Sequence, residues 1–319
     1  MNDLNGLWRA DGLTADESAI IQSLAAVRCG RLARNERRMA YYEDEVECKN
    51  LGLAVPPQIA RDVDTSVGWC AKAVDALATR TVFDGFTCMD APTAEKVAEI
   101  VKASDMPMSY KMAVPSELVY GCGFWTVSPD EDFGVAINYH DAVTASALWD
   151  YRRKRVKAGL VVEDFRQKGK TTPDLVEPCF VVVHTSDSVI ELERGDRSDW
   201  HAVRKPHRVG RPLIEPMCYK PTNKKPFGAS RITKACMGIT DDMMREIVRT
   251  SLHSELYSSG MKAILGVTDE QYDAIMGDRY RAAMTSLFVA TRDREGNVPD
   301  IEQFAQQSME PHIAAMDKL

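Results

Sequence analysis

The sequence predicts an α+β fold in which a large mixed domain and a small module are joined by one long helix. Residues 240–259 carry apolar side chains at helical spacing, and residues 15–48 show a second helical pattern. Between them, residues 112–204 contain short β-rich segments separated by Gly, Pro and polar turns. At 319 residues the chain is long enough for about two domains.

The composition is that of an ordinary folded protein, with 45% apolar and 27% charged residues. A net charge of −7 argues against a broad basic surface that grips nucleic acid. The first residues lack a basic stretch followed by an apolar core, and no apolar run approaches the ~18–20 residues that span a bilayer. We therefore expect neither a secretion signal nor a membrane partner. The eight cysteines form no CxxC motif, which predicts reduced, mostly buried thiols from a cytoplasmic folding environment.

The first third of the chain is predicted to be helical. The pattern indicates helices over residues 15–48, 63–78 and 93–103. The double proline of residues 56–57 forces an extended backbone and so separates the first two helices. Several arginines lie off the apolar stripe of the first helix: Arg28, Arg31, Arg34, Arg37 and Arg38. Because glutamates are interleaved with them, we expect a solvated or partner-facing surface, with nucleic-acid contact as the alternative.

The middle third is predicted to consist of antiparallel strands. From Met112 onward, Val114, Val119, Tyr120, Phe124 and Val127 indicate short strands among glycines and prolines. Residues 144–150 and 155–163 predict a hairpin around an exposed basic turn at 151–154, and residues 179–184, 188–193 and 200–204 predict three more strands. Five prolines in residues 206–226 predict an ordered but irregular connector.

The long helix is predicted over residues 240–259, with Thr240 as its N-cap and Gly260 as its stop. A longer version would begin near Ser230 and include Gly238. The apolar stripe suited to packing is Met243, Met244, Ile247, Val248 and Leu252. It fits either a neighbouring copy or the helix's own chain. The charged face, nearly balanced in sign, carries Asp241, Asp242, Arg245, Glu246 and Arg249.

Beyond the long helix we expect a small strand-containing module. Residues 261–267 and 287–291 predict strands, residues 269–276 a short helix, and residues 292–299 a turn. Residues 301–319 predict a further helix with no stop signal, so we expect the natural chain to continue.

The sequence contains none of the common catalytic motifs. Phosphate-loop, dinucleotide-binding, HExxH and GxSxG patterns are all missing, so we expect no catalytic residue, no metal and no cofactor. The alternative of a metal-dependent hydrolase would use His201, His207 and Asp199, which are close together in sequence and of metal-ligating type.

Several stretches resemble the portal proteins of long-tailed double-stranded-DNA bacteriophages, in particular the branch found in phages of actinobacteria. The resemblance is carried by PFGASRI at residue 226, ITDDMMREIVRTSLHSELYSS and MKAILG. Upstream it extends to RMAYYEDEVECKNLGLAVPPQI, VGWCAKAVDALATRTVFDGF and ALWDYRRKRVKAGLVV. These stretches occur in the family's order along most of the chain.

The resemblance implies a structural role in the virion. In that family, twelve copies usually form a ring at one capsid vertex, and double-stranded DNA passes through the centre without sequence-specific binding. The implied partners are further copies of the chain, the major capsid protein, the terminase large subunit during packaging and then the head-tail adaptor. Assembly would take place in the host cytoplasm.

The family's parts can be placed on this sequence. Residues 1–235 resemble the wing, 236–259 the first stem helix, 260–300 the clip and 301–319 the start of the second stem helix. The tunnel loop and crown have no counterpart here. Clip docking would involve Lys262, Asp269, Arg292 and Arg294. A head-tail adaptor is a further alternative, although adaptors are usually much smaller.

Overall fold

The computed structural model describes residues 4–47, 65–130, 134–167, 176–195, 199–258, 262–265, 300–303 and 308–318. The chain divides into two compact units, Met1–Glu45 with Gly68–Met237, and Val46–Val67 with Gly238–Leu319. Helices and antiparallel sheets occur together, so the predicted α+β class is confirmed. The helix α6, Lys234–Ser258, begins in the first unit and continues in the second.

The first unit opens with a short 3₁₀ turn, η1 (Leu7–Arg9), and the long helix α1 (Ala15–Tyr42). A capping box starts α1: the Thr14 side chain accepts from the backbone N–H of Glu17, and the Glu17 carboxylate accepts from that of Thr14 at 2.8 Å. The predicted helix over residues 15–48 is thus confirmed as far as Tyr42. Its basic side chains are not uniformly solvated, because Arg28 is only 3% exposed and its Nε donates to the carbonyl of Val143 at 2.7 Å.

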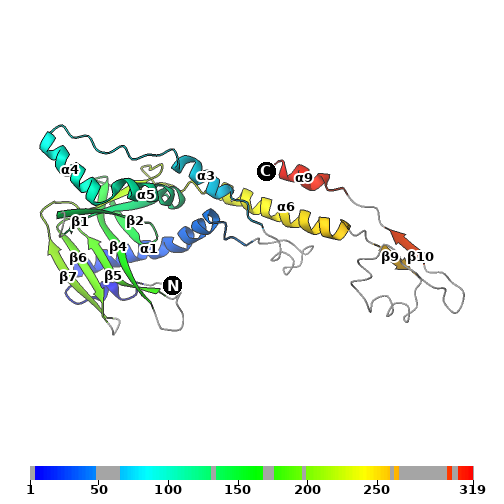
Figure 1. Ribbon diagram of the computed structural model, residues 1–319. Coiled ribbons are helices and arrows are strands. Elements are labelled where there is room, and N and C mark those ends of the chain that lie inside the picture. The colour runs from blue at the N-terminus through cyan, green and yellow to red at the C-terminus, as the bar shows by residue number, and fades with distance from the viewer. Residues whose placement is uncertain are drawn as a thin grey trace. The chain divides into compact units, whose positions relative to one another are not determined.

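A five-stranded antiparallel sheet forms the centre of this unit (Figure 1). Its strands follow one another in sequence order, each hydrogen-bonded to the next, which confirms the predicted hairpin and the three strands after it. The strands are β3 (Ala145–Asp150), β4 (Arg155–Gln167), β5 (Val176–His184), β6 (Ser188–Arg194) and β7 (Trp200–Pro206).

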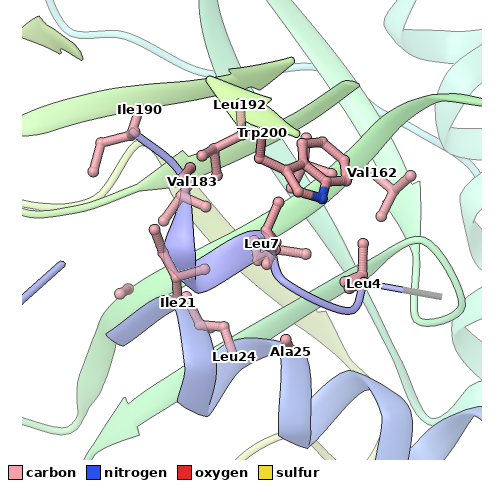
Figure 2. Packing of buried hydrophobic residues seen from close by; sticks show 14 residues of the cluster. Leu4, Leu7, Ile21, Leu24, Ala25, Val162, Val183, Ile190, Leu192 and Trp200 are labelled. Atoms are coloured by element: carbon pink, nitrogen blue, oxygen red, sulfur yellow. The ribbon is translucent and has the colours of Figure 1, made fainter. Parts of the chain in front are cut away.

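The main core lies between α1 and one face of this sheet. Val183 and Ile190, from the neighbouring strands β5 and β6, share one buried cluster with Ile21 and Leu24 of α1 (Figure 2). Leu160 of β4, Leu7 of η1 and Trp200 of β7 belong to the same cluster. Each fully buried side chain of this size stabilises the fold by about 1.5–3 kcal/mol, so this interface fixes α1 on the sheet.

A second sheet has three strands in the order β2-β1-β8: β1 (Cys122–Asp130), β2 (Gly134–Asp141) and β8 (Ile214–Cys218). The strand β8 corrects the prediction of an irregular connector over residues 206–226. Pro216 lies opposite Phe124 in this pairing. Proline is accepted in a strand at the edge of a sheet, where its missing N–H faces away from the ladder.

Two helices pack on the second sheet, α4 (Ala91–Ala103) and α5 (Met106–Tyr120), and α3 (Trp69–Ala78) packs on α5 and α1. Of these, α5 corrects the prediction of strands at Val114, Val119 and Tyr120. All three residues are buried on a helix that ends at Gly121, whose φ of 98° is left-handed. The predicted strand character survives only for Phe124 and Val127, which belong to β1. The second predicted helix begins at Trp69, later than residue 63.

The long helix α6 starts six residues before its predicted N-cap. The hydroxyl of Thr233 accepts from the backbone N–H of Cys236 at 3.2 Å, which supplies the cap. Gly238 is accommodated inside the helix, and Thr240 is a buried interior residue, so the prediction that Thr240 caps the helix is wrong. The longer version of the helix was the better description.

In the second unit, β9 (Lys262–Leu265) pairs antiparallel with β10 (Asp300–Gln303). This confirms a strand within residues 261–267. It also corrects the helix predicted over residues 301–319, because Ile301–Gln303 are extended and the helix α9 covers only Glu310–Met316. Pro311 in the first turn of α9 suits a helix start there. The predicted helix at 269–276, strand at 287–291 and turn at 292–299 lie outside the described residues.

Candidate functional site

The charged residues predicted on the long helix pair with one another along α6. Arg245 forms an ion pair with Asp242, and Arg249 with Glu246 at 2.5 Å, both at i,i+3 spacing. Such pairs on a helix surface contribute only about 0.3–0.5 kcal/mol each. Their chemical effect is that each guanidinium already faces a carboxylate, which weakens its attraction for an external phosphate.

The apolar positions of α6 separate into two groups. Thr240, Met244 and Val248, four residues apart, are buried by the chain itself, with Val248 fully so. Met243, Ile247 and Leu252 are half-buried. Of the two packing partners that the sequence allowed, the helix's own chain therefore covers Met244 and Val248. The half-buried group keeps surface for another contact.

Near the middle of α6, the carboxylate of Glu246 contacts His312, whose ring in turn contacts His253. The His312 Nδ1 lies 3.3 Å from Glu246 Oε2, and the rings of His253 and His312 contact each other edge-on with centroids 5.2 Å apart. Glu246 consequently has both Arg249 and His312 as neighbours. This ties α9 to α6 inside the second unit.

The residues predicted to dock partners at the clip are mostly not part of the described chain. Lys262 is the first residue of β9 and lies opposite Gln303 of β10. Asp269, Arg292 and Arg294 lie outside the described residues. The prediction for these three positions therefore stays a prediction.

The residues of the alternative metal site lie along β7: Asp199 comes just before the strand, His201 is within it and His207 follows it. His201 lies opposite Glu193 in the sheet, and the backbone N–H of His207 donates to the carbonyl of Asp187 at 2.8 Å. In the part of the chain that the structure describes, no three His, Cys, Asp or Glu side chains come together as metal ligands. None of the helices in these same ranges is long and apolar enough to cross a bilayer.

The PFGASRI stretch packs within the first unit through Phe227. Its ring contacts Phe124 of β1 and Trp149 of β3, with centroid distances of 5.9 Å and 5.8 Å. The Arg31 guanidinium lies over the same ring, 5.4 Å from its centroid. Phe227 therefore connects α1, both sheets and the segment that leads into α6.

Beside Phe227 lies a pocket of about 560 Å³, entirely within the first unit. Tyr120, Cys122 and Asn35 are buried and form part of its floor. Its walls come from α1, the β3–β4 hairpin, the α5–β1 junction and the segment before α6. Six cationic side chains line this basic pocket: Arg31, Arg34, Arg38, Lys157, Lys224 and Lys225.

The three arginines of α1 stand out in the sequence, and Lys157 ends the basic run YRRKRVK that begins at residue 151, whereas Lys224 and Lys225 were not predicted. The helical spacing of Arg31, Arg34 and Arg38 places them on one face, and that signal was readable. The lysines come from segments more than a hundred positions away along the chain, and no spacing rule connects such segments.

Comparison with known proteins adds no assignment. No family model matches the chain, and no curated protein matches it.

Proposed function

We propose that this chain is the subunit of a phage portal: a ring at the capsid vertex through which double-stranded DNA enters and leaves. The observation that carries the proposal is the long helix α6, whose sequence and immediate neighbours bear the ordered resemblance to that family. A helix of 25 residues is roughly 38 Å long at about 1.5 Å per residue. That length suits the wall of a channel.

The charges of α6 support a conduit role. A channel that held phosphates through strong ion pairs would slow translocation, because each phosphate contact adds affinity. Arg245 and Arg249 each face a carboxylate on their own helix, so their attraction for passing phosphates is reduced. In this proposal the protein contributes shape and assembly and carries out no hydrolysis itself.

The partners follow from the same proposal. Twelve copies would form the ring, the major capsid protein would surround it, and the terminase large subunit and then the head-tail adaptor would dock on residues 260–300. Lys262, Asp269, Arg292 and Arg294 are the positions we assign to that docking.

Electron microscopy of the purified full chain tests the proposal. We expect rings with a central hole and twelvefold symmetry. Monodisperse monomers across a range of protein and salt concentrations would contradict it.

A charge on the half-buried face of α6 provides a sharper test. Ile247→Asp places a carboxylate on the half-buried face of α6, beside Met243. If that face contacts a neighbouring copy, the charge is buried without a partner, which is costly. Ser254→Asp adds the same charge at an exposed position of the same helix and serves as the control. We expect Ile247→Asp to abolish rings while leaving the circular dichroism spectrum unchanged, and Ser254→Asp to form normal rings. Normal rings from both variants would show that this face does not contact a neighbour.

A further inference from the structure

The basic pocket concentrates positive charge in a protein whose net charge is −7. Its six cationic side chains come from three separate segments, and no Asp or Glu is among the residues that line it. None of the three arginines forms an ion pair with any carboxylate in the described ranges. A concave site with unopposed cations is a site for an anion.

The arginines are held in place by contacts that do not neutralise them. Arg38 Nη1 donates to the carbonyl of Tyr120 at 3.0 Å, and the Arg31 guanidinium rests on the ring of Phe227. Below them, the Asn35 amide donates to the carbonyl of Ala142 at 3.0 Å, which fixes this turn of α1 at the pocket floor. The cationic groups are therefore positioned before any ligand arrives, and this lowers the entropy cost of binding.

These arginines also repel one another. Burial and the neighbouring Arg34 lower the pKa of Arg38 to about 10, and burial and Arg31 lower the pKa of Arg34. An anion placed among them would relieve that repulsion. The arrangement is unfavourable for the empty protein and favourable for a complex.

The shape of the pocket indicates what kind of anion fits. Its volume of about 560 Å³ lies within the range of small-molecule sites, which is about 300–1,000 Å³. Three guanidinium groups can each bind phosphate oxygens in a bidentate manner, and lysines at the rim add point charges. At the mouth, the Tyr151 ring is 65% exposed and can stack on a planar base.

We propose that the basic pocket binds a small polyphosphate anion, either a nucleoside triphosphate or an inorganic polyphosphate, through Arg31, Arg34 and Arg38. Lys157, Lys224 and Lys225 complete the charge at the rim. The proposal is independent of the portal assignment, since it rests on side chains of the first unit alone.

Isothermal titration calorimetry on the full chain tests this with ATP, tripolyphosphate and citrate as probes. We expect ATP and tripolyphosphate to bind one per chain, with affinity that falls as salt is added, and citrate to bind at least tenfold more weakly. Arg34→Glu and Lys225→Glu should each weaken binding of both phosphate probes by tenfold or more. Arg208→Glu, an equal charge change at an exposed residue outside the pocket, should leave binding within twofold.

The two sources of phosphate are distinguished by Tyr151→Ala. If ATP binds more tightly than tripolyphosphate and this variant removes the difference, the site takes a nucleotide. If the two probes bind equally and the variant changes nothing, the phosphate chain alone is recognised. The proposal is overturned if neither phosphate probe binds at millimolar concentration, if Arg34→Glu leaves binding unchanged in a folded protein, or if only a DNA duplex binds.

Discussion

The backbone of Gly228 lies directly against that of Gly121. A Cβ atom on Gly228 would come within 2.5 Å of the Gly121 carbonyl oxygen, and a Cβ on Gly121 would come within 2.9 Å of the Ala229 backbone. Both residues have positive φ, +69° and +98°. This close approach seats the PFGASRI segment on the end of α5 and so forms one wall of the basic pocket.

Gly228→Ala should therefore destabilise the first unit. The new methyl group meets backbone atoms that have no room to move, in addition to the cost of about 1–3 kcal/mol for a strained left-handed residue. Gly210→Ala is the matched control, because Gly210 also has positive φ but has nothing within 4 Å of an added Cβ. Urea unfolding should show a clearly larger loss of stability for Gly228→Ala, and equal losses would refute the packing argument.

Two adjacent methionines of α6 should respond differently to truncation. Met244 is only 4% exposed, so Met244→Ala is expected to lower the free energy of unfolding by about 2–5 kcal/mol. Met243 is half-buried, so Met243→Ala should lower it much less. Chemical denaturation at low protein concentration, where copies do not associate, is the measurement. A larger effect at Met243 would mean that the buried face of the helix is assigned to the wrong side.

His184 should make the protein sensitive to acid. It is buried, and within the described residues neither ring nitrogen has a hydrogen-bond partner. Burial, with the nearby His140 and His207, lowers the pKa of His184 from 6.5 to about 4. Between these pH values the unfolded chain binds a proton at His184 that the folded chain does not bind. The free energy of unfolding therefore falls as the pH drops from about 6.5 toward 4.

His184→Leu removes both the unpaired nitrogens and this proton linkage. We expect a gain of about 1–3 kcal/mol at neutral pH and a larger gain at pH 5, measured as the shift in urea midpoint. His201→Leu, at an exposed position of β7, should change stability by no more than about 0.5 kcal/mol at either pH. An equal effect of His184→Leu at both pH values would count against the linkage.

Glu117 should give the stability of the protein a pH dependence of the opposite sign. Burial raises the pKa of Glu117 from 4.5 to about 7, so the folded chain holds a proton there that the unfolded chain has lost. Stability should consequently fall as the pH rises from about 4.5 to 7. Glu117→Gln should be more stabilising at pH 8 than at pH 5, whereas the exposed Glu95→Gln should show no such difference. The measurement is the shift in melting temperature of each variant at the two pH values, and equal shifts for Glu117→Gln at pH 5 and pH 8 would contradict the prediction.

The sequence was sufficient for the elements whose local pattern agrees with their environment. The strands β5 and β6 are rich in β-branched residues such as Val181, Val183 and Ile190. The helix α1 has a complete capping box at Thr14 and Glu17. In these segments propensity, pattern and turn residues all favour the same structure. Their bounds were accordingly predicted within a few residues.

Elements whose structure depends on tertiary contacts were missed. The helix α5 contains Pro115 and valines, which locally disfavour helix, and its burial against β1 and β2 of the second sheet and against α1 and α3 outweighs that preference. The strand β8 contains Pro216 and forms only because β1 offers an open edge. The basic pocket was likewise hidden, since Arg34 and Lys225 become neighbours only through the packing of Phe227 and Gly228. For the long helix, Thr240 resembled a cap while Thr233 supplies it.

The pairing of β8 with β1 bears on how the protein is made. The Trp125 indole donates to the Met217 sulfur at 3.4 Å across 92 residues of chain. During synthesis, the residues between β1 and β8 must all leave the ribosome before β8 can pair with the edge of β1. During that interval the nascent chain presents an open strand edge, which is a ready template for pairing with another polypeptide. Yield of soluble protein should thus depend on synthesis speed and chaperone supply across residues 130–218.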